Sequence, residues 1–400
     1  MRYTIGEMAE IIDGDRGKNY PQQHEFLDEG YCLFLNTGNV TKAGFSFDSN
    51  QFISKEKCDL LRKGKLQRHD IVYTTRGTVG NAAFYSDSIP YEHVRINSGM
   101  VIIRPKETIV CTEFLYQILK SDYYRPFFRK YCTGSAQPQL PIKNFSTIEL
   151  DLPDLPVQRC IAGILSSYDD LIENNQKQIK LLEEAAQRLY KEWFVDLRFP
   201  GHETTPIVDG VPEGWKKDSL GSICTLKKDT VSAGKIPVGT PYIGLEHMPR
   251  DDFCLSSWGN AEEVTSNKFQ YTEDDIIFGK IRPYFHKVGF ALNSGVVSTD
   301  SFVLKANDGL WGLLLMTVFD KLFVDYTYQT CKEGAKMPRA DWGQMEKYPV
   351  LIPPESARKD FEEFIWNNTR RVKVLALQNH ALAEARDRLL PKLMSGEIEV

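Results

Sequence analysis

The chain has 400 residues, 42% of them hydrophobic and 26% charged, with a formal net charge of −5 at pH 7. These values fit a multi-domain protein with buried cores, and no apolar run approaches the roughly 18 residues that span a bilayer. The start of the chain lacks the features of a signal peptide, and the cysteines and histidines lack the spacing of a zinc site or a disulfide framework, so we expect a cytoplasmic protein without a metal.

The first part of the chain mixes short strands with an amphipathic helix. Residues 70–75 and 100–104 are β-branched and aromatic runs that predict strands. Thr112–Lys120 places Phe114 and Ile118 on one helical face and predicts a helix. This mixture favours an α+β globular segment.

A basic stretch lies within that segment, between residues 55 and 76. It is rich in lysine and arginine and has few acidic residues. Such a stretch either contacts nucleic-acid phosphates or is a solvated charged surface. The glycines of Thr74–Gly80 let the backbone approach a ligand closely. The candidate DNA contacts of this stretch are Lys63, Lys65, Arg68 and Arg76.

A second candidate loop begins at Gly134. Its residues Gln137 and Gln139 have side chains that can bond to the edge of adenine in the major groove. The alternative is a structural turn whose polar side chains bond to the neighbouring backbone. Both interpretations remain open at this point.

A long helix follows the first segment. Apolar positions recur every three or four residues from Leu165 to Trp193, which is typical of one face of a coiled coil. The positions of this seam are Leu165, Tyr168, Ile172, Asn175, Ile179, Leu182 and Leu189.

The second half of the chain has the same organisation as the first. Residues 275–278 and 301–305 predict strands, and Leu310–Phe323 predicts one helix. At positions that correspond to the basic loop and the Gly134 loop, the candidate DNA contacts are Lys280, Arg282, Lys336 and Arg339.

A second long helix closes the chain, and Pro391 followed by Gly396 predicts its end. Its seam positions are Ile365, Val372, Leu375, Asn379, Leu382 and Leu389. Antiparallel pairing of the two seams would bury both, with Asn175, Asn368 and Asn379 fixing the register at a cost in stability. The alternative is that each helix packs only on its own globular segment.

An internal duplication explains why the halves are alike. Gly134–Pro138 resembles Gly334–Pro338 at an offset of 334 minus 134, or 200 residues, and Pro153 and Pro353 keep the same offset. A solenoid repeat has only about 20 to 45 residues. The chain is therefore predicted to contain two copies of one globular segment followed by one helix, related by a pseudo-two-fold axis.

Four stretches resemble the specificity subunit of Type I restriction-modification enzymes, and the resemblance covers nearly the whole chain. They are LPDLPVQRCIAGIL at Leu152–Leu165, LYKEWFVD at Leu189–Asp196, PEGW at Pro212–Trp215 and RLLPKLMSGEI at Arg388–Ile398. The family often has Glu-Gln where Val157-Gln158 stands, and the second helix start has neither residue.

The resemblance implies the domain plan. Target recognition domains occupy residues 1–152 and 215–352, conserved helical regions that act as spacer helices occupy 153–198 and 353–400, and 199–214 is a linker. The fold class is α+β, with two pseudo-symmetric recognition domains separated by two long helices that pair as an antiparallel coiled coil.

The resemblance also implies partners. The domains would recognise double-stranded DNA, and the helical regions would dock two methyltransferase subunits, to which restriction subunits can be added. S-adenosylmethionine belongs to the methyltransferase and ATP to the restriction subunit, so this chain binds no cofactor. A helix of roughly 35 residues is about 50 Å long, more than the roughly 34 Å of one DNA turn. A bipartite, asymmetric target with an unread gap is therefore expected.

The sequence contains no motif for catalysis. It has neither a Walker lysine loop nor a G-x-G-x-x-G turn after a strand, and Ile352–Glu355 lacks the residues that a methyltransferase has around two prolines. A non-catalytic protein is therefore expected. Two other classes stay open: a coiled-coil adaptor without DNA contact, which the net charge of −5 favours, and an enzyme without a known motif.

Overall fold

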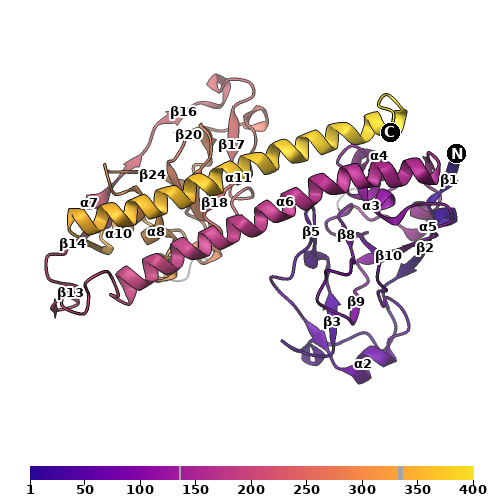
Figure 1. Ribbon diagram of the computed structural model, residues 1–400, viewed down its shortest axis with the longest axis horizontal. Coiled ribbons are helices and arrows are strands. Elements are labelled where there is room, and N and C mark those ends of the chain that lie inside the picture. The colour runs from indigo at the N-terminus through magenta and orange to yellow at the C-terminus, as the bar shows by residue number, and fades with distance from the viewer. Residues whose placement is uncertain (135–136, 332–336) are drawn as a thin grey trace. The chain divides into compact units, whose positions relative to one another are not determined.

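The computed structural model describes residues 1–134, 137–331 and 337–400 (Figure 1). The chain divides into two compact units, one formed by Met1–Leu171 with Leu382–Val400 and the other by Ile172–Ala381. Each unit contains one of the predicted globular segments and part of each long helix. The candidate contact Lys336 lies outside the described residues.

The first unit is built on a four-stranded antiparallel sheet in the order β2-β10-β7-β8. Its strands are β2 (Ala9–Asp13), β10 (Met100–Pro105), β7 (Ile71–Thr74) and β8 (Ala82–Phe84). Successive side chains point to opposite faces, so Tyr73 packs in one core and Val72 in another. The sheet is therefore covered on both faces, which explains the continuous apolar run of β7.

One face of this sheet is covered by helices and the other by a smaller sheet in the order β6-β3-β9, in which β3 and β9 are parallel. The strands of the smaller sheet are β3 (Cys32–Leu35), β6 (Phe52–Ile53) and β9 (Val94–Ile96). The remaining elements are β1 (Arg2–Thr4), α1 (Ile5–Met8), β4 (Val40–Thr41), β5 (Gly44–Phe45), α2 (Lys55–Leu60), α3 (Thr112–Lys120), α4 (Arg125–Arg129), α5 (Ile142–Ser146) and β11 (Glu149–Asp151).

The second unit has the same plan with longer sheets. The central order β15-β24-β21-β22-β18 corresponds to β2-β10-β7-β8 with one added strand, and β17 pairs in parallel with β23 as β3 does with β9. The repeated topology agrees with the predicted duplication, and the α+β class is confirmed. The central strands are β15 (Cys224–Lys227), β18 (Cys254–Leu255), β21 (Ile276–Gly279), β22 (Val288–Ala291) and β24 (Ser301–Ala306).

Shorter elements complete the second unit. The second sheet has the order β16-β20-β23-β17-β19, and β14 pairs with β25 as β1 pairs with β11. These elements are β12 (Ile207–Val208), β13 (Val211–Pro212), β14 (Lys216–Ser219), α7 (Leu220–Ile223), β16 (Thr230–Val231), β17 (Pro241–Ile243), β19 (Gly259–Asn260), β20 (Lys268–Tyr271), β23 (Gly295–Val297), α10 (Trp342–Met345) and β25 (Pro349–Ile352).

The prediction of one helix over Leu310–Phe323 is wrong. Two helices stand there, α8 (Trp311–Phe319) and α9 (Lys321–Gln329), and they are separated by Asp320 in an extended conformation. The Asp320 carboxylate accepts a hydrogen bond from the backbone N–H of Leu322 at 2.8 Å. Aspartate is a favoured N-cap residue because it satisfies a free donor of the first turn, so it starts a new helix here.

The long helices are α6 (Leu155–Tyr190), which continues into a π-helical turn at Lys191–Val195, and α11 (Glu355–Ser395). In the first unit, the Arg386 guanidinium lies 2.6 Å from the Asp169 carboxylate, and Leu165 and Leu390 share one core. The two helix ends thus pack on each other and on α3 together.

The second unit contains the other parts of both helices. The Asn175 amide donates to the Asn379 side-chain oxygen at 2.9 Å, and the Phe194 and Phe361 rings lie 4.9 Å apart between centroids. From Asn175 to Phe194 the residue number rises along α6 and its π-helical turn, while that of the partner on α11 falls from Asn379 to Phe361, so the pairing is antiparallel. None of the predicted seam residues is exposed.

The second helix continues through Pro391 to Ser395, so of the two residues predicted to end it only Gly396 does so. A proline inside a helix removes one backbone hydrogen bond. Leu390 and Leu393 on either side of it are buried in the core of the first unit, and this packing keeps the helix continuous. Gly396, with φ of +72°, follows the last helical residue, as expected for a helix C-terminus.

Candidate nucleic-acid interface

Two candidate loops of the first unit meet at one edge. The loop that follows β7 pairs with the segment that precedes α5 through a β-bridge between Arg76 and Gln139. The backbone N–H of Leu140 donates to the Thr75 carbonyl at 2.9 Å, which fixes the two segments side by side. Arg76 is half-buried, and within the described residues its guanidinium makes no hydrogen bond or ion pair. The structure therefore brings Arg76 and Gln139 together, and Gln137 is exposed nearby in the sequence.

The same edge exists in the second unit. Ile281 forms a β-bridge with Arg339, and the backbone N–H of Arg282 donates to the Pro338 carbonyl at 2.8 Å. Arg282 has a φ of +52°, in the left-handed region, and its guanidinium lies over the Phe285 ring. The exposed Arg339 side chain forms an ion pair with Asp300 at 2.9 Å. Corresponding loops of both units thus present different side chains at equivalent edges.

Lys63 and Lys65 lie elsewhere in the first unit. Both are exposed, and their backbone contacts are with the buried Arg95 of β9. Among the described residues, no hydrogen bond or bridge joins them to the edge formed by Arg76 and Gln139. They remain candidates for phosphate contacts only.

Two candidates have structural roles that the sequence did not indicate. The Arg68 guanidinium donates to the backbone carbonyls of Ser86 and Ile89 and stacks over the Tyr85 ring at 4.3 Å. Lys280 donates to the Thr299 carbonyl at 2.7 Å and lies over the Phe302 ring. These contacts tie both cations to their own domain.

Burial supports the structural role of Lys280. Its partial burial lowers the pKa of the ammonium group, because the charged form loses hydration. The neighbouring carboxylate of Asp300 opposes this effect. Lys280 therefore ties the loop after β21 to the Thr299 carbonyl and to Phe302 of β24, and its ammonium group is less available for a DNA contact.

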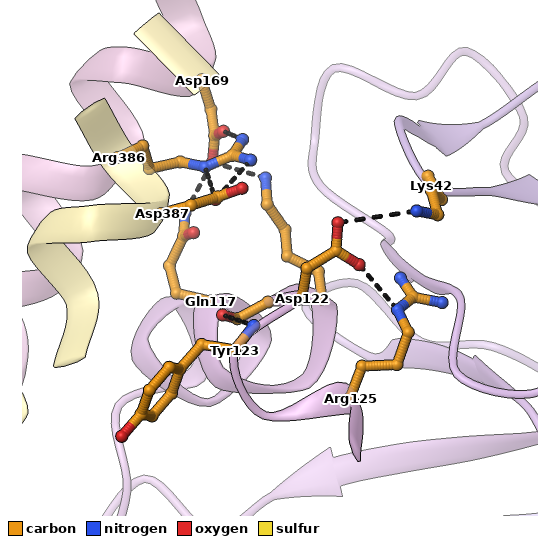
Figure 2. A network of polar contacts seen from close by, with 10 residues as sticks. Lys42, Gln117, Asp122, Tyr123, Arg125, Asp169, Arg386 and Asp387 are labelled. Carbon is orange, nitrogen blue, oxygen red and sulfur yellow. Dashed lines mark hydrogen bonds and ion pairs between the residues drawn. The ribbon is translucent and has the colours of Figure 1, made fainter. Parts of the chain in front are cut away.

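Sequence reasoning missed a basic groove next to the first edge. It has a volume of about 690 Å³, and its lining includes Lys42, Asn81, Arg125, Arg129 and Gly134. Figure 2 shows Asp122 between Lys42 and Arg125, with oxygen-to-nitrogen distances of 3.5 and 2.8 Å. These residues come from the β4-β5 turn, the loop after β7, helix α4 and the segment between α4 and α5, so only their isolated charges were visible in the sequence.

The described residues show no metal centre. No group of three or more histidine, cysteine, aspartate or glutamate side chains among them could hold a metal ion. The cysteine thiols are all unpaired by disulfides. None of the described helices is both long and apolar enough to cross a membrane.

The chain is similar in sequence to known proteins. A family model described as the Type I restriction modification DNA specificity domain matches residues 1–184. The specificity subunit of the Type I restriction enzyme MjaIX from Methanocaldococcus jannaschii is 26% identical over 355 residues, covering 82% of this chain and 78% of that protein. The HindI specificity subunit from Haemophilus influenzae is 27% identical over 479 residues, covering 98% and 100%.

A solved structure has the same fold. The crystal structure of a Type-I restriction-modification system S subunit from M. genitalium aligns over 98% of this chain and 95% of that chain, with a TM-score of 0.56 and 14% sequence identity. At this identity the likeness concerns the fold alone.

Proposed function

Because this chain belongs to the family of Type I restriction-modification specificity subunits, we propose that it recognises a bipartite, asymmetric DNA target, one half with each domain. The observation that carries the proposal is the repeated loop edge, where Arg76 pairs with Gln139 in one unit and Ile281 with Arg339 in the other. Equivalent backbone positions with different side chains are what two dissimilar half-sites require.

The side chains at the two edges have suitable chemistry for bases. Glutamine bonds adenine through two atoms of its major-groove edge, and arginine bonds guanine in the same way. Gln139 and Arg76 belong to the first unit, and Arg339 to the second. Each good bidentate pair discriminates against a wrong base by about 1 to 3 kcal/mol.

The helices would dock two methyltransferase subunits. In the second unit, Leu181 of α6 is 65% exposed and Phe364 of α11 is 41% exposed. Both line a shallow groove of about 500 Å³ together with Ala185 and Arg188. Exposed apolar side chains beside an arginine are typical of protein interfaces and support a docking role.

In this proposal the chain itself catalyses no reaction. S-adenosylmethionine would be bound by the methyltransferase subunits, and ATP by a restriction subunit where one joins. The chain's own residues would hold the DNA in register so that one adenine of each half-site reaches a methyltransferase.

The test is a map of methylated adenines in cells that carry the chain together with its methyltransferase. Wild type should give one two-part motif, Arg76→Ala should relax only one half, and Arg339→Ala only the other. If both variants altered the same half, or neither altered the motif, the assignment of one half-site to each domain would be rejected. Co-purification should give two methyltransferase subunits per chain.

The second candidate is a coiled-coil adaptor that does not touch DNA, which the net charge of −5 favours. Reversing the charges of the exposed Arg339 and the half-buried Arg76 discriminates the two functions. A DNA-recognising complex should lose affinity for duplex DNA when both arginines are replaced by glutamate. An adaptor should still assemble with its partner proteins, and its affinity for duplex DNA should not change. Lys280 is unsuitable for this test because of its structural contacts.

A further inference from the structure

Two cations that line the groove of the first unit, Lys42 and Arg125, are paired with the carboxylate of Asp122. One oxygen of Asp122 accepts a hydrogen bond from the Arg125 Nε at 2.8 Å, and the other lies 3.5 Å from the Lys42 Nζ (Figure 2). The Asp122 side chain is 56% exposed, so solvent or a ligand reaches it. A carboxylate thus bridges two cations that line the groove.

Arg125 is held in place independently of Asp122. Its Nη1 donates to the Asn81 side-chain oxygen at 3.3 Å, and the Asn81 amide donates to the Val40 carbonyl at 2.9 Å. The Arg125 side chain is only 14% exposed, so its guanidinium has little freedom. A pre-positioned arginine binds an anion without the entropy cost of ordering its long side chain.

The other cations of the groove are exposed to solvent. Lys42 is 70% exposed, and the exposed Arg129 makes no hydrogen bond or ion pair within the described parts of the chain. Gly77 and Gly134 line the same groove with positive φ, and a backbone without a Cβ admits a close ligand.

We propose that Asp122 occupies the place of a DNA backbone phosphate, and that duplex DNA displaces its carboxylate from Arg125 and Lys42. This inference rests on the proposed function. A phosphate presents two anionic oxygens to an arginine in the same geometry as a carboxylate does. The exchange replaces one anion by another, so the cations are paired in both states. The ion pair lowers the affinity for DNA of any sequence, because a phosphate that binds Arg125 or Lys42 must first displace Asp122.

The site belongs to one unit only. Helix α3 begins at Thr112 and its counterpart α8 at Trp311, an offset of 311 minus 112, or 199 residues. At this offset Arg125 corresponds to the buried Val324 and Asp122 to Lys321. Among the described residues of the second unit these positions form no equivalent bridge, so we expect the effect of Asp122 at the half of the target that the first unit binds.

The test uses the full-length chain and duplex DNA of random sequence, titrated over a range of salt concentrations. Asp122→Asn keeps the shape and removes the charge, so affinity should rise by about two- to tenfold, as expected when one or two exposed ion pairs no longer compete. The dependence of affinity on salt should become steeper. Lys42→Ala should make it shallower, by about 0.9 in the logarithmic slope for one lost phosphate contact.

The matched control is Asp151→Asn. Asp151 lies in the same unit, is 70% exposed and is bonded to Arg2, which, unlike Lys42 and Arg125, does not line this groove. Equal gains for the two variants would mean that only net charge matters, and would overturn the proposal. If wild type did not bind duplex DNA at all, the proposed function would fail first and this inference with it.

Discussion

Replacing Asp169 with asparagine would remove the central negative charge of a buried network in the first unit (Figure 2). One carboxylate oxygen accepts from the Gln117 amide at 2.6 Å and from the Lys120 Nζ at 2.7 Å, and the other from Arg386 at 2.6 Å. The network joins α3, α6 and α11. Asparagine has nearly the same shape, so the change isolates the loss of charge.

The expected cost follows from what the substitution leaves behind. Lys120 and Arg386 have side chains that are only 11% and 18% exposed, and both would face each other without their shared carboxylate. Removing one partner of a buried ion pair costs about 3 to 5 kcal/mol. Arg386 keeps its bond to Asp387 at 2.8 Å, so we expect about 3 kcal/mol, at the lower end of that range.

Urea unfolding can assign this loss to one unit. All the tryptophans of the chain lie between residues 172 and 381, in the second unit, whereas far-ultraviolet circular dichroism follows both units. Asp169→Asn should lower the midpoint of the dichroism transition more than that of tryptophan fluorescence. Asp151→Asn, at an exposed pair, should change neither by much.

The pH dependence has a definite sign. Burial alone would raise the pKa of Asp169, but the Lys120 charge and the hydrogen bonds outweigh it, and the pKa is lowered. The stabilisation is therefore present above the unfolded pKa of about 3.9 and lost as the pH falls through the lower folded value. Wild type and variant should converge in acid. A loss below about 1 kcal/mol at pH 7 would show that water solvates these cations, and the argument from burial would be wrong.

Three further predictions concern other parts of the chain. Burial raises the pKa of Glu183 to about 8, so the stability of the wild type should fall as the pH rises from about 4.5 to 8. Glu183→Gln should remove this dependence and should be more stable than the wild type at pH 8, by an amount on the order of 3 kcal/mol. Urea unfolding followed by tryptophan fluorescence measures the difference. Asn379→Leu should cost about 1 to 3 kcal/mol in thermal unfolding, because the Asn175 amide is left unpaired, and replacing both by leucine should restore stability. In binding assays with duplex DNA that contains the two-part motif found by methylation mapping, Arg76→Ala and Arg339→Ala should each lose about 1 to 3 kcal/mol of base discrimination, each at a different half-site.

Much of the architecture was predictable because it is encoded locally or by repetition. The offset of 200 residues between Gly134 and Gly334 revealed the duplication, and the three- and four-residue spacing from Leu165 revealed a helix that packs along one face. Thr112–Lys120 forms a helix with the predicted bounds. Where local signals competed, the prediction failed, as at Asp320, whose capping side chain divides an apolar run into two helices.

The candidate site was predictable only in part. The sequence selected the loops that contain Arg76 and Gln139, and it could not show that a β-bridge joins them. The basic stretch also suggested Arg68, whose guanidinium donates to backbone carbonyls 18 and 21 residues away. A long cationic side chain looks the same in a sequence whether it holds a loop or faces a ligand.

The sequence by itself determined the duplication, the long helices, the α+β class and the resemblance to Type I specificity subunits, since hydrophobic periodicity and repeated motifs are properties of neighbouring or regularly spaced residues. Only the tertiary structure decided which charges meet, such as Lys42, Asp122 and Arg125 around one groove. The physical reason is that a contact between distant residues depends on the path of the whole backbone, and the energy of a charge depends on the burial and the partners which that path provides.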